Sequence, residues 1–192
     1  MEKLYHVSPI ANLDILQPKM STHGKAYVYA TKDLDFALLF GSQKSYGDFD
    51  GIYGVNNGKP FFYEAYKGAF ERRFKGETCY IYEVDPTNFI EGKTSFTHEF
   101  VSEVPVKILS STKIEDLYVY LQEQIANGKL DFHKFSTNKN YQNEIKEHIR
   151  ERIETWEVYK KPNSRSYKIC QEQFPKLLKA IEEHYEKNWN AR

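Results

Sequence analysis

The sequence predicts an α+β protein, and three observations carry this prediction. Short runs of β-branched and aromatic residues, separated by Gly, Pro and Asn, fill residues 1–112. Longer segments with apolar side chains at helical spacing fill residues 113–192. Aromatic residues make up 16% of the 192-residue chain, enough to line a cleft as well as a core. We therefore expect a split antiparallel β-sheet module over 1–112 and a helical appendage, packed on or beside it, over 113–192.

The first expected strands are Leu4–Ser8 and Ala26–Thr31, both rich in Val and Tyr. Between them, Ala11–Leu16 is expected to form a single helical turn. A short helix should follow the second strand, because the last residue of that strand or Asp33 can cap its N-terminus and Gly41 can end it.

Further strands are expected on either side of good turn signals. Asn57-Gly58 is typical of a two-residue hairpin turn between Gly51–Val55 and Phe61–Tyr66. Tyr80–Val84 is a clear strand. Glu99–Val104 and Val106–Leu109 are expected as two pieces, because Pro105 cannot donate to a sheet ladder.

The last third of the chain predicts three helices. Thr112–Glu115 matches a capping box and should begin the first helix, which runs to Ala126. The second is expected at Asn140–Tyr159, with isoleucines along one face. The third is expected at about Ser166–Asn188, where Pro175 predicts either a kink or a later start with Pro in the first turn.

Composition narrows the function classes. The 27 basic and 27 acidic residues balance, which gives no support to a strongly nucleic-acid-binding or membrane-surface protein. Cys79 and Cys170 belong to no CxxC pair and suit buried thiols in a reducing compartment. No metal site is expected, since His98, His23 and the cysteines lack zinc-ligand spacing. With no apolar run at Met1–His6 and no membrane span, we expect a cytoplasmic protein.

Three segments together resemble the ADP-ribosyltransferase fold. The first, Leu4–Ser8, carries His6 near its end, followed shortly by the small hydroxyl residue Ser8. The second, Val28–Thr31, carries Tyr29 and precedes a short helix with an inward alanine. The third opens with Glu99, followed by aromatic and β-branched residues. Their order resembles the His-Tyr-Glu layout of poly(ADP-ribose) polymerases, diphtheria toxin and rifampin ADP-ribosyltransferases.

The resemblance implies a site that binds NAD as substrate. His6 would hydrogen-bond the adenosine ribose, the backbone of Val7 would hold the nicotinamide amide, and the hydroxyl of Ser8 would support that end. Tyr29 would stack on the nicotinamide ring. Glu99 would be the catalytic residue, bonded to the 2′-hydroxyl of the nicotinamide ribose, where it would stabilise the positive charge that develops as nicotinamide leaves.

Some assignments stay open. Val7 stands where the family usually has Gly, so its Cβ would crowd the ring. Tyr27 shares the facing of Tyr29 and is the rival platform. Glu103 shares the facing of Glu99 and is the rival acid.

The expected function is therefore ADP-ribosyl transfer from NAD to a protein or nucleic-acid acceptor, or NAD glycohydrolysis. The main alternative is a non-catalytic module that binds a nucleotide or a partner on the same fold. An RNA 2′-phosphotransferase is disfavoured, because that chemistry needs several Arg and His, and the bases near the site are only Lys19, His23, Lys25 and Lys32.

Overall fold

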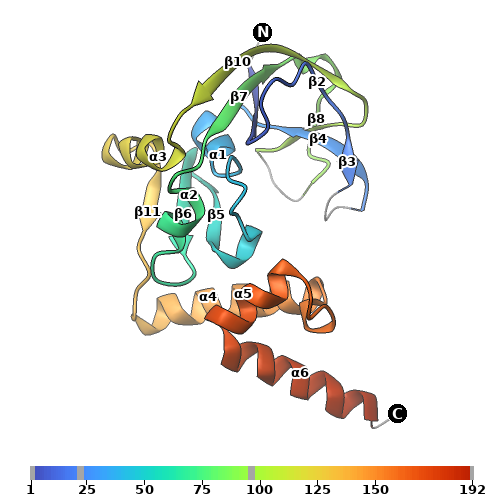
Figure 1. Cartoon of the computed structure of the whole chain (residues 1–192), viewed down its shortest axis with the longest axis vertical. Coiled ribbons are helices and arrows are strands. Elements are labelled where there is room, and N and C mark those ends of the chain that lie inside the picture. Colours follow the sequence, from blue (N-terminus) through green and yellow to red (C-terminus); the bar gives the residue numbers. More distant parts are fainter. Residues whose placement is uncertain (1–2, 21–23, 95–97, 191–192) are drawn as a thin grey trace. The chain divides into compact units, whose positions relative to one another are not determined.

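The computed structural model describes residues 3–20, 24–94 and 98–190, and it confirms the α+β class with antiparallel sheets and C-terminal helices (Figure 1). His23 lies outside the described residues. The chain forms two compact units, each built from several segments. The first unit comprises Met1–Lys44, Gly54–Phe61 and Phe74–Asp131, and the second Ser45–Tyr53, Phe62–Arg73 and Phe132–Arg192. Residues 113–131 of the expected appendage thus belong to the first unit.

The first sheet lies in the first unit and has the strand order β1-β7-β10-β2. Its strands are β1 (Leu4–Ser8), β7 (Cys79–Val84), β10 (Val106–Ile114) and β2 (Ile15–Leu16). All neighbours pair antiparallel, and Leu4 of the edge strand β1 lies opposite Val84 of β7. The strands expected around His6 and Tyr82 are confirmed.

A second sheet in the first unit has the order β3-β4-β9-β8. It consists of β3 (Lys19–Met20), β4 (Ala26–Ala30), β9 (Phe100–Ser102) and β8 (Ile90–Glu91), again antiparallel. An isolated bridge between Tyr5 and Thr31 joins β1 to the residue after β4. The strands that carry the three resembling segments are therefore neighbours, although they are far apart in sequence.

The helical turn predicted at residues 11–16 is wrong. Ile15 and Leu16 form β2, and they pair with Lys107 and Val106 of β10. Sheet pairing satisfies the backbone of this short segment, and that pairing overrides its weak helical pattern.

A third sheet has the order β11-β6-β5, with β5 (Gly51–Asn56), β6 (Lys59–Glu64) and β11 (Asp131–His133). The hairpin predicted at Asn57-Gly58 is confirmed. Its two residues have φ of 49° and 73°, as a type I′ turn requires. At Gly51 a Cβ would lie 2.3 Å from the backbone oxygen of Tyr63, so this close approach of two strands needs glycine.

The first unit contains two short helices. In α1 (Leu34–Leu38) the predicted cap is confirmed, because Asp33 Oδ1 accepts the N–H of Phe36 at 2.9 Å. The capping box predicted at Thr112 is wrong. Residues up to Ile114 remain in β10 because they pair with β7, and α3 (Leu117–Ala126) begins after Asp116, whose side chain accepts the N–H of Val119.

The second unit contains most of α2 (Ala69–Phe74) and the whole of α4 (Lys139–Thr155), α5 (Arg165–Gln173) and α6 (Pro175–Asn190). Single 3₁₀ turns occur at Gly47–Phe49 and Val158–Lys160 here, and at Pro86–Asn88 in the first unit. The single helix expected over about Ser166–Asn188 is divided at Phe174 into α5 and α6. Pro175 opens α6, where its missing N–H leaves no bond unmade.

Each unit has its own apolar core. In the first unit it lies between the two sheets, around Leu4, Val28 and Tyr82. In the second unit Ile145, Ile149 and Ile153 of α4, as predicted from their spacing, are buried with the side chains of Phe49, Ala65, Tyr66, Ala69, Leu178 and Ile181. Among the described residues no helix is both long and apolar enough to cross a membrane.

Candidate functional site

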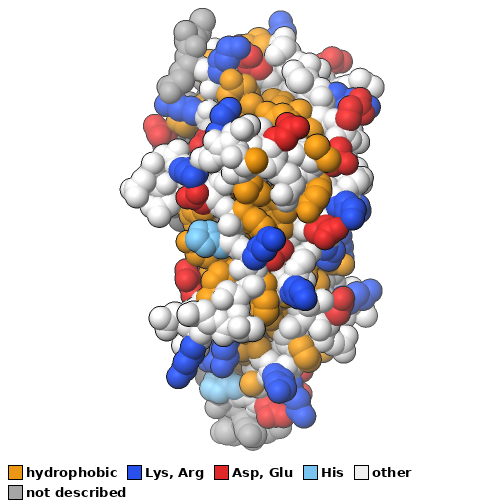
Figure 2. Space-filling view, turned by 90° about the vertical axis from the view of Figure 1, so that its left-hand side faces the viewer, with side chains coloured by type: hydrophobic (Ala, Val, Ile, Leu, Met, Phe, Trp, Pro, Cys, Tyr) orange, Lys and Arg blue, Asp and Glu red, His pale blue; other side chains and the backbone are white. Residues whose placement is uncertain are grey.

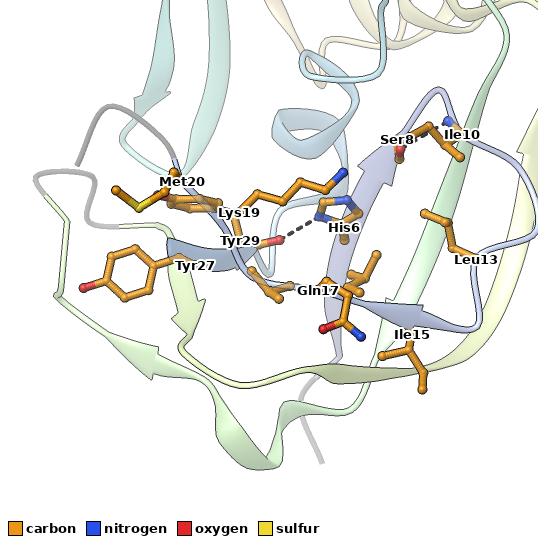
Figure 3. Close-up of a pocket in the computed structure, with 12 residues that line it drawn as sticks. His6, Ser8, Ile10, Leu13, Ile15, Gln17, Lys19, Met20, Tyr27 and Tyr29 are labelled. Atoms are coloured by element: carbon orange, nitrogen blue, oxygen red, sulfur yellow. Dashed lines mark hydrogen bonds between the residues drawn. The ribbon is translucent and has the colours of Figure 1, made fainter. Parts of the chain in front are cut away.

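A cavity of about 400 Å³ lies in the first unit. Its size falls within the range typical of small-molecule sites. It is lined from β1 to β4 and the segments between them, by His6, Ser8, Ile10, Leu13, Ile15, Leu16, Gln17, Lys19, Met20, Tyr27, Val28 and Tyr29 (Figure 3). Three of the five residues expected to form the site, His6, Ser8 and Tyr29, thus line one cavity.

His6 is fixed by a bond to the backbone of the neighbouring strand. Its Nδ1 lies 2.8 Å from the carbonyl oxygen of Tyr29, the dashed line in Figure 3. A carbonyl oxygen only accepts, so Nδ1 carries the hydrogen, and in the neutral ring Nε2 offers a lone pair. Burial lowers the pKa of His6 below its ordinary 6.5, the bond to Tyr29 opposes this, and the charge of Lys19 adds to the lowering.

The junction of β1 and β4 explains how this bond arises. Tyr5 donates its N–H to the oxygen of Thr31 at 2.8 Å, and Thr31 donates to the oxygen of Tyr5 at 3.0 Å. At His6, the next residue of β1, the side-chain ring makes the hydrogen bond to β4 in place of the backbone. The side chain of His6 therefore lies at the point where the two sheets part.

Ser8 and Val7 occupy opposite faces of β1. Ser8 is buried at the end of the strand, where its Oγ accepts the N–H of Ile10 at 3.2 Å. Val7 is also buried, but it contacts Gly41, where an added Cβ would lie 3.0 Å from Val7 Cγ1. Val7 is not among the residues that line the cavity.

Tyr27 and Tyr29 both line the cavity. Their rings meet edge to face, with centroids 5.9 Å apart. In Figure 3 the ring of Tyr27 points away from His6, whereas the backbone oxygen of Tyr29 is directed at it. Tyr27 is buried and Tyr29 half-buried, which leaves more of the Tyr29 ring available to a ligand.

Glu99 directly precedes β9, which pairs with β4 through Tyr29 and Val101. Extending that register places Glu99 beside Thr31 and on the same face of the sheet as Tyr29. The side chain of Glu99 is half-buried, and it is not among the residues that line the cavity. The structure brings its strand to the Tyr29 strand but does not bring Glu99 into the cavity lining.

Glu103, the rival acid, has a different setting. It is exposed and pairs with Lys25, with the ammonium nitrogen 2.6 Å from Oε1. Its carboxylate is therefore paired with a surface cation, at the opposite end of β9 from Glu99.

The sequence-based reading missed the part of the lining that comes from β2 and β3. These strands contribute Ile15, Lys19 and Met20, and Gln17 lies between them. Each strand is only two residues long, too short for alternation to reveal it. The one sequence feature that could have pointed to this part of the lining is the isolated Lys19 beside Pro18. A single charged residue, however, does not indicate a cavity.

A second polar cluster lies in the second unit, around the fully buried Asp50. Asp50 accepts from the hydroxyl of Tyr66 at 3.0 Å and from the backbone N–H of Tyr46 at 2.7 Å, and Arg72 donates to the same carboxylate. Arg73, 1% exposed, pairs with it at 3.7 Å. Because these interactions join residues of the cluster to one another, we interpret the cluster as stabilising the fold of the second unit.

No group of three or more His, Cys, Asp or Glu side chains in the described part of the chain could hold a metal ion. On the face shown in Figure 2, basic and acidic side chains are interspersed, and neither sign forms a continuous patch.

No protein-family model, curated protein or solved structure matches the chain.

Proposed function

We propose that this chain binds NAD in the cavity and transfers its ADP-ribose to an acceptor or to water. The observation that carries the proposal is the joint placement of His6, Ser8 and Tyr29 on one cavity. The sequence resemblance assigns these residues to NAD binding, and their strands are distant in sequence but adjacent in space.

The lining suits the parts of a dinucleotide. His6 presents an acceptor nitrogen, which fits a ribose hydroxyl, and its lowered pKa favours the neutral ring that can accept. The ring of Tyr29 provides an aromatic face for a flat heterocycle. Apolar residues such as Leu13 and Val28 supply the remaining surface, a common composition for small-molecule sites.

The proposed reaction breaks the bond between C1′ of the ribose and the ring nitrogen of nicotinamide. Nicotinamide leaves neutral with the bonding electrons, and C1′ becomes cationic. The oxygen or nitrogen of the acceptor, or a water molecule, forms the new bond to C1′ and loses a proton. In this scheme Glu99 contributes a negative charge near the ribose, whose effect is largest when the cation is fully developed.

A non-catalytic binding module is the second candidate. It is favoured by the absence of Glu99 from the cavity lining and by the buried side chain of Val7 at the expected nicotinamide end. In that case the cavity binds a nucleotide without turnover.

The test is incubation of the purified protein with NAD, followed by chromatography for free nicotinamide and by calorimetry for binding. Nicotinamide release supports the proposed reaction. Binding of NAD without release selects the non-catalytic module, and neither binding nor release overturns both.

We also propose a reducing, cytoplasmic setting. Cys79 and Cys170 are free thiols, both fully buried, and burial raises the pKa of each to about 12. Such thiols are poor nucleophiles and persist reduced, as expected where disulfides do not form.

A further inference from the structure

Among the described residues that line the cavity, Lys19 is the one Lys or Arg, and none is Asp or Glu. The other lining residues are apolar or neutral, apart from the titratable His6. Lys19 is exposed and stands at the rim of the cavity, where its ammonium group can reach a ligand from solvent. The described part of the lining therefore carries one cation and no carboxylate.

The field of Lys19 reaches the ring of His6. It is one cause of the lowered pKa of His6, after burial, and Figure 3 shows the ammonium end of Lys19 turned towards the ring. Lys19 belongs to β3, which pairs with β4 through Tyr27, so the same strand that carries Tyr29 positions it. Two polar functions thus converge, an acceptor nitrogen and a cation.

The neighbouring lysine behaves differently. The ammonium of Lys25 is 2.6 Å from Glu103, whereas no carboxylate within the described residues pairs with Lys19. The charge of Lys25 is compensated on the protein itself. The charge of Lys19 is available to a ligand.

We propose that Lys19 recognises a phosphoryl group of the ligand, so that the cavity selects nucleotides over nucleosides. A ribose phosphate presents a hydroxyl donor and an anion a few bonds apart, which matches His6 Nε2 beside the Lys19 ammonium. The identification of the natural ligand as NAD rests on the proposed function. The selection of a phosphorylated ligand by Lys19 does not require turnover.

The experiment compares the affinities of ADP-ribose and adenosine by calorimetry. The proteins are wild type, Lys19→Met, Lys19→Arg and Lys25→Met. Lys19→Met keeps the length of the side chain and deletes its charge, and Lys25→Met makes the same change in net charge at a compensated site. We expect Lys19→Met to raise the Kd for ADP-ribose about tenfold, on the scale of one charge-assisted hydrogen bond. The Kd for adenosine should stay constant, Lys19→Arg should retain most of the affinity, and Lys25→Met should match wild type.

Proton NMR of the His6 ring gives a second readout, which tests whether the charge of Lys19 acts at the ring that would bind the ribose. In Lys19→Met the pKa of His6 should rise, because removal of a nearby cation favours the protonated ring. An unchanged pKa, an equal loss of both ligands, or a loss as large in Lys25→Met overturns the proposal. So does a wild-type protein that binds neither ligand.

The two proposals fail separately. Lys19-dependent binding of ADP-ribose without nicotinamide release from NAD leaves this inference standing and removes the catalytic one. Release of nicotinamide by a protein whose affinity for NAD is unchanged in Lys19→Met does the reverse.

Discussion

The Nδ1 atom of His6 and the carbonyl oxygen of Tyr29 are 2.8 Å apart, although the residues are separated by 23 positions in the sequence. This bond sets the tautomer of the ring, and with it the direction of Nε2. The nitrogen that would accept from a ligand is therefore oriented by backbone that is itself part of a sheet. Such preorganisation lowers the ordering cost of binding.

The first prediction concerns pH and the stability contributed by His6. Its pKa is lowered in the folded protein, so below pH 6.5 the unfolded chain takes up a proton that the folded chain resists. The free energy of unfolding should fall as pH decreases from 6.5 towards the folded pKa, and level off below it. His6→Gln keeps a donor for Tyr29 but does not titrate. Urea unfolding across this range should show a shallower pH dependence in the variant, and equal slopes would contradict the prediction.

Glu99→Gln is expected to lower nicotinamide release by about 10²–10³ while changing NAD affinity little, since the charge acts mainly on the transition state. Single-turnover release and calorimetry measure the two effects. Glu103→Gln is the matched control and should stay near wild type, because Glu103 is held by Lys25 at the surface. If Glu103→Gln is the slow variant, the catalytic assignment moves to that residue.

Tyr29→Ala should affect binding more than turnover. Loss of a stacking face is expected to weaken NAD binding by roughly 1–3 kcal/mol. Tyr29→Phe keeps the ring and serves as the control, with near wild-type affinity by calorimetry. Because Tyr27 lies at 5.9 Å from the same ring, Tyr27→Ala is measured in parallel, and a larger loss there would identify Tyr27 as the platform.

Asp50→Ala should destabilise the second unit strongly. The substitution removes the shared partner of Tyr66, Arg72 and Arg73 from a fully buried position. Breaking a buried ion pair typically costs about 3–5 kcal/mol. Urea denaturation measures the loss. Glu157→Ala disrupts the exposed pair with Lys160 and should leave stability unchanged, so equal effects would show that burial of Asp50 is not the cause.

A chain that ends at Asp131 should aggregate. The removed helices contribute Ile145 and Ile149 to the core that buries Phe49, Ala65 and Tyr66. Without the helices, the side chains of Phe49, Ala65 and Tyr66 become exposed to solvent. Light scattering and near-ultraviolet circular dichroism test this. A folded, monodisperse truncated chain would show that the segments of the second unit before residue 132 are stable without their helices.

Local patterns predicted the elements whose signals are contained in a few residues. The turn at Asn57-Gly58, the cap at Asp33 and the buried face of α4 depend on neighbours in sequence, and all three are confirmed. The capping box predicted at Thr112 is wrong because the backbone around Thr112 pairs with the distant strand β7 and so stays in β10. Pairing partners of that kind leave no mark in the local sequence.

The candidate site was predictable to a similar degree. His6, Ser8 and Tyr29 were singled out from the order of three segments, and all three line the cavity. Lys19 was named as a base near the site, but its place in the cavity lining depends on the pairing of β3 with Tyr27, which the local sequence does not reveal. Whether Glu99 acts on a ligand stays a prediction.

The interleaved composition of the second unit has a consequence for synthesis on the ribosome. Residues 45–53 and 62–73 emerge long before residues 132–192, which complete their core. At typical elongation rates the last segment takes about 3–12 s to be made. During that interval the side chains of Phe49 and Tyr66 lack their helical cover, and the nascent chain presents an apolar stretch of the kind that chaperones bind. The second unit can therefore complete its core only after residues 132–192 have left the ribosome.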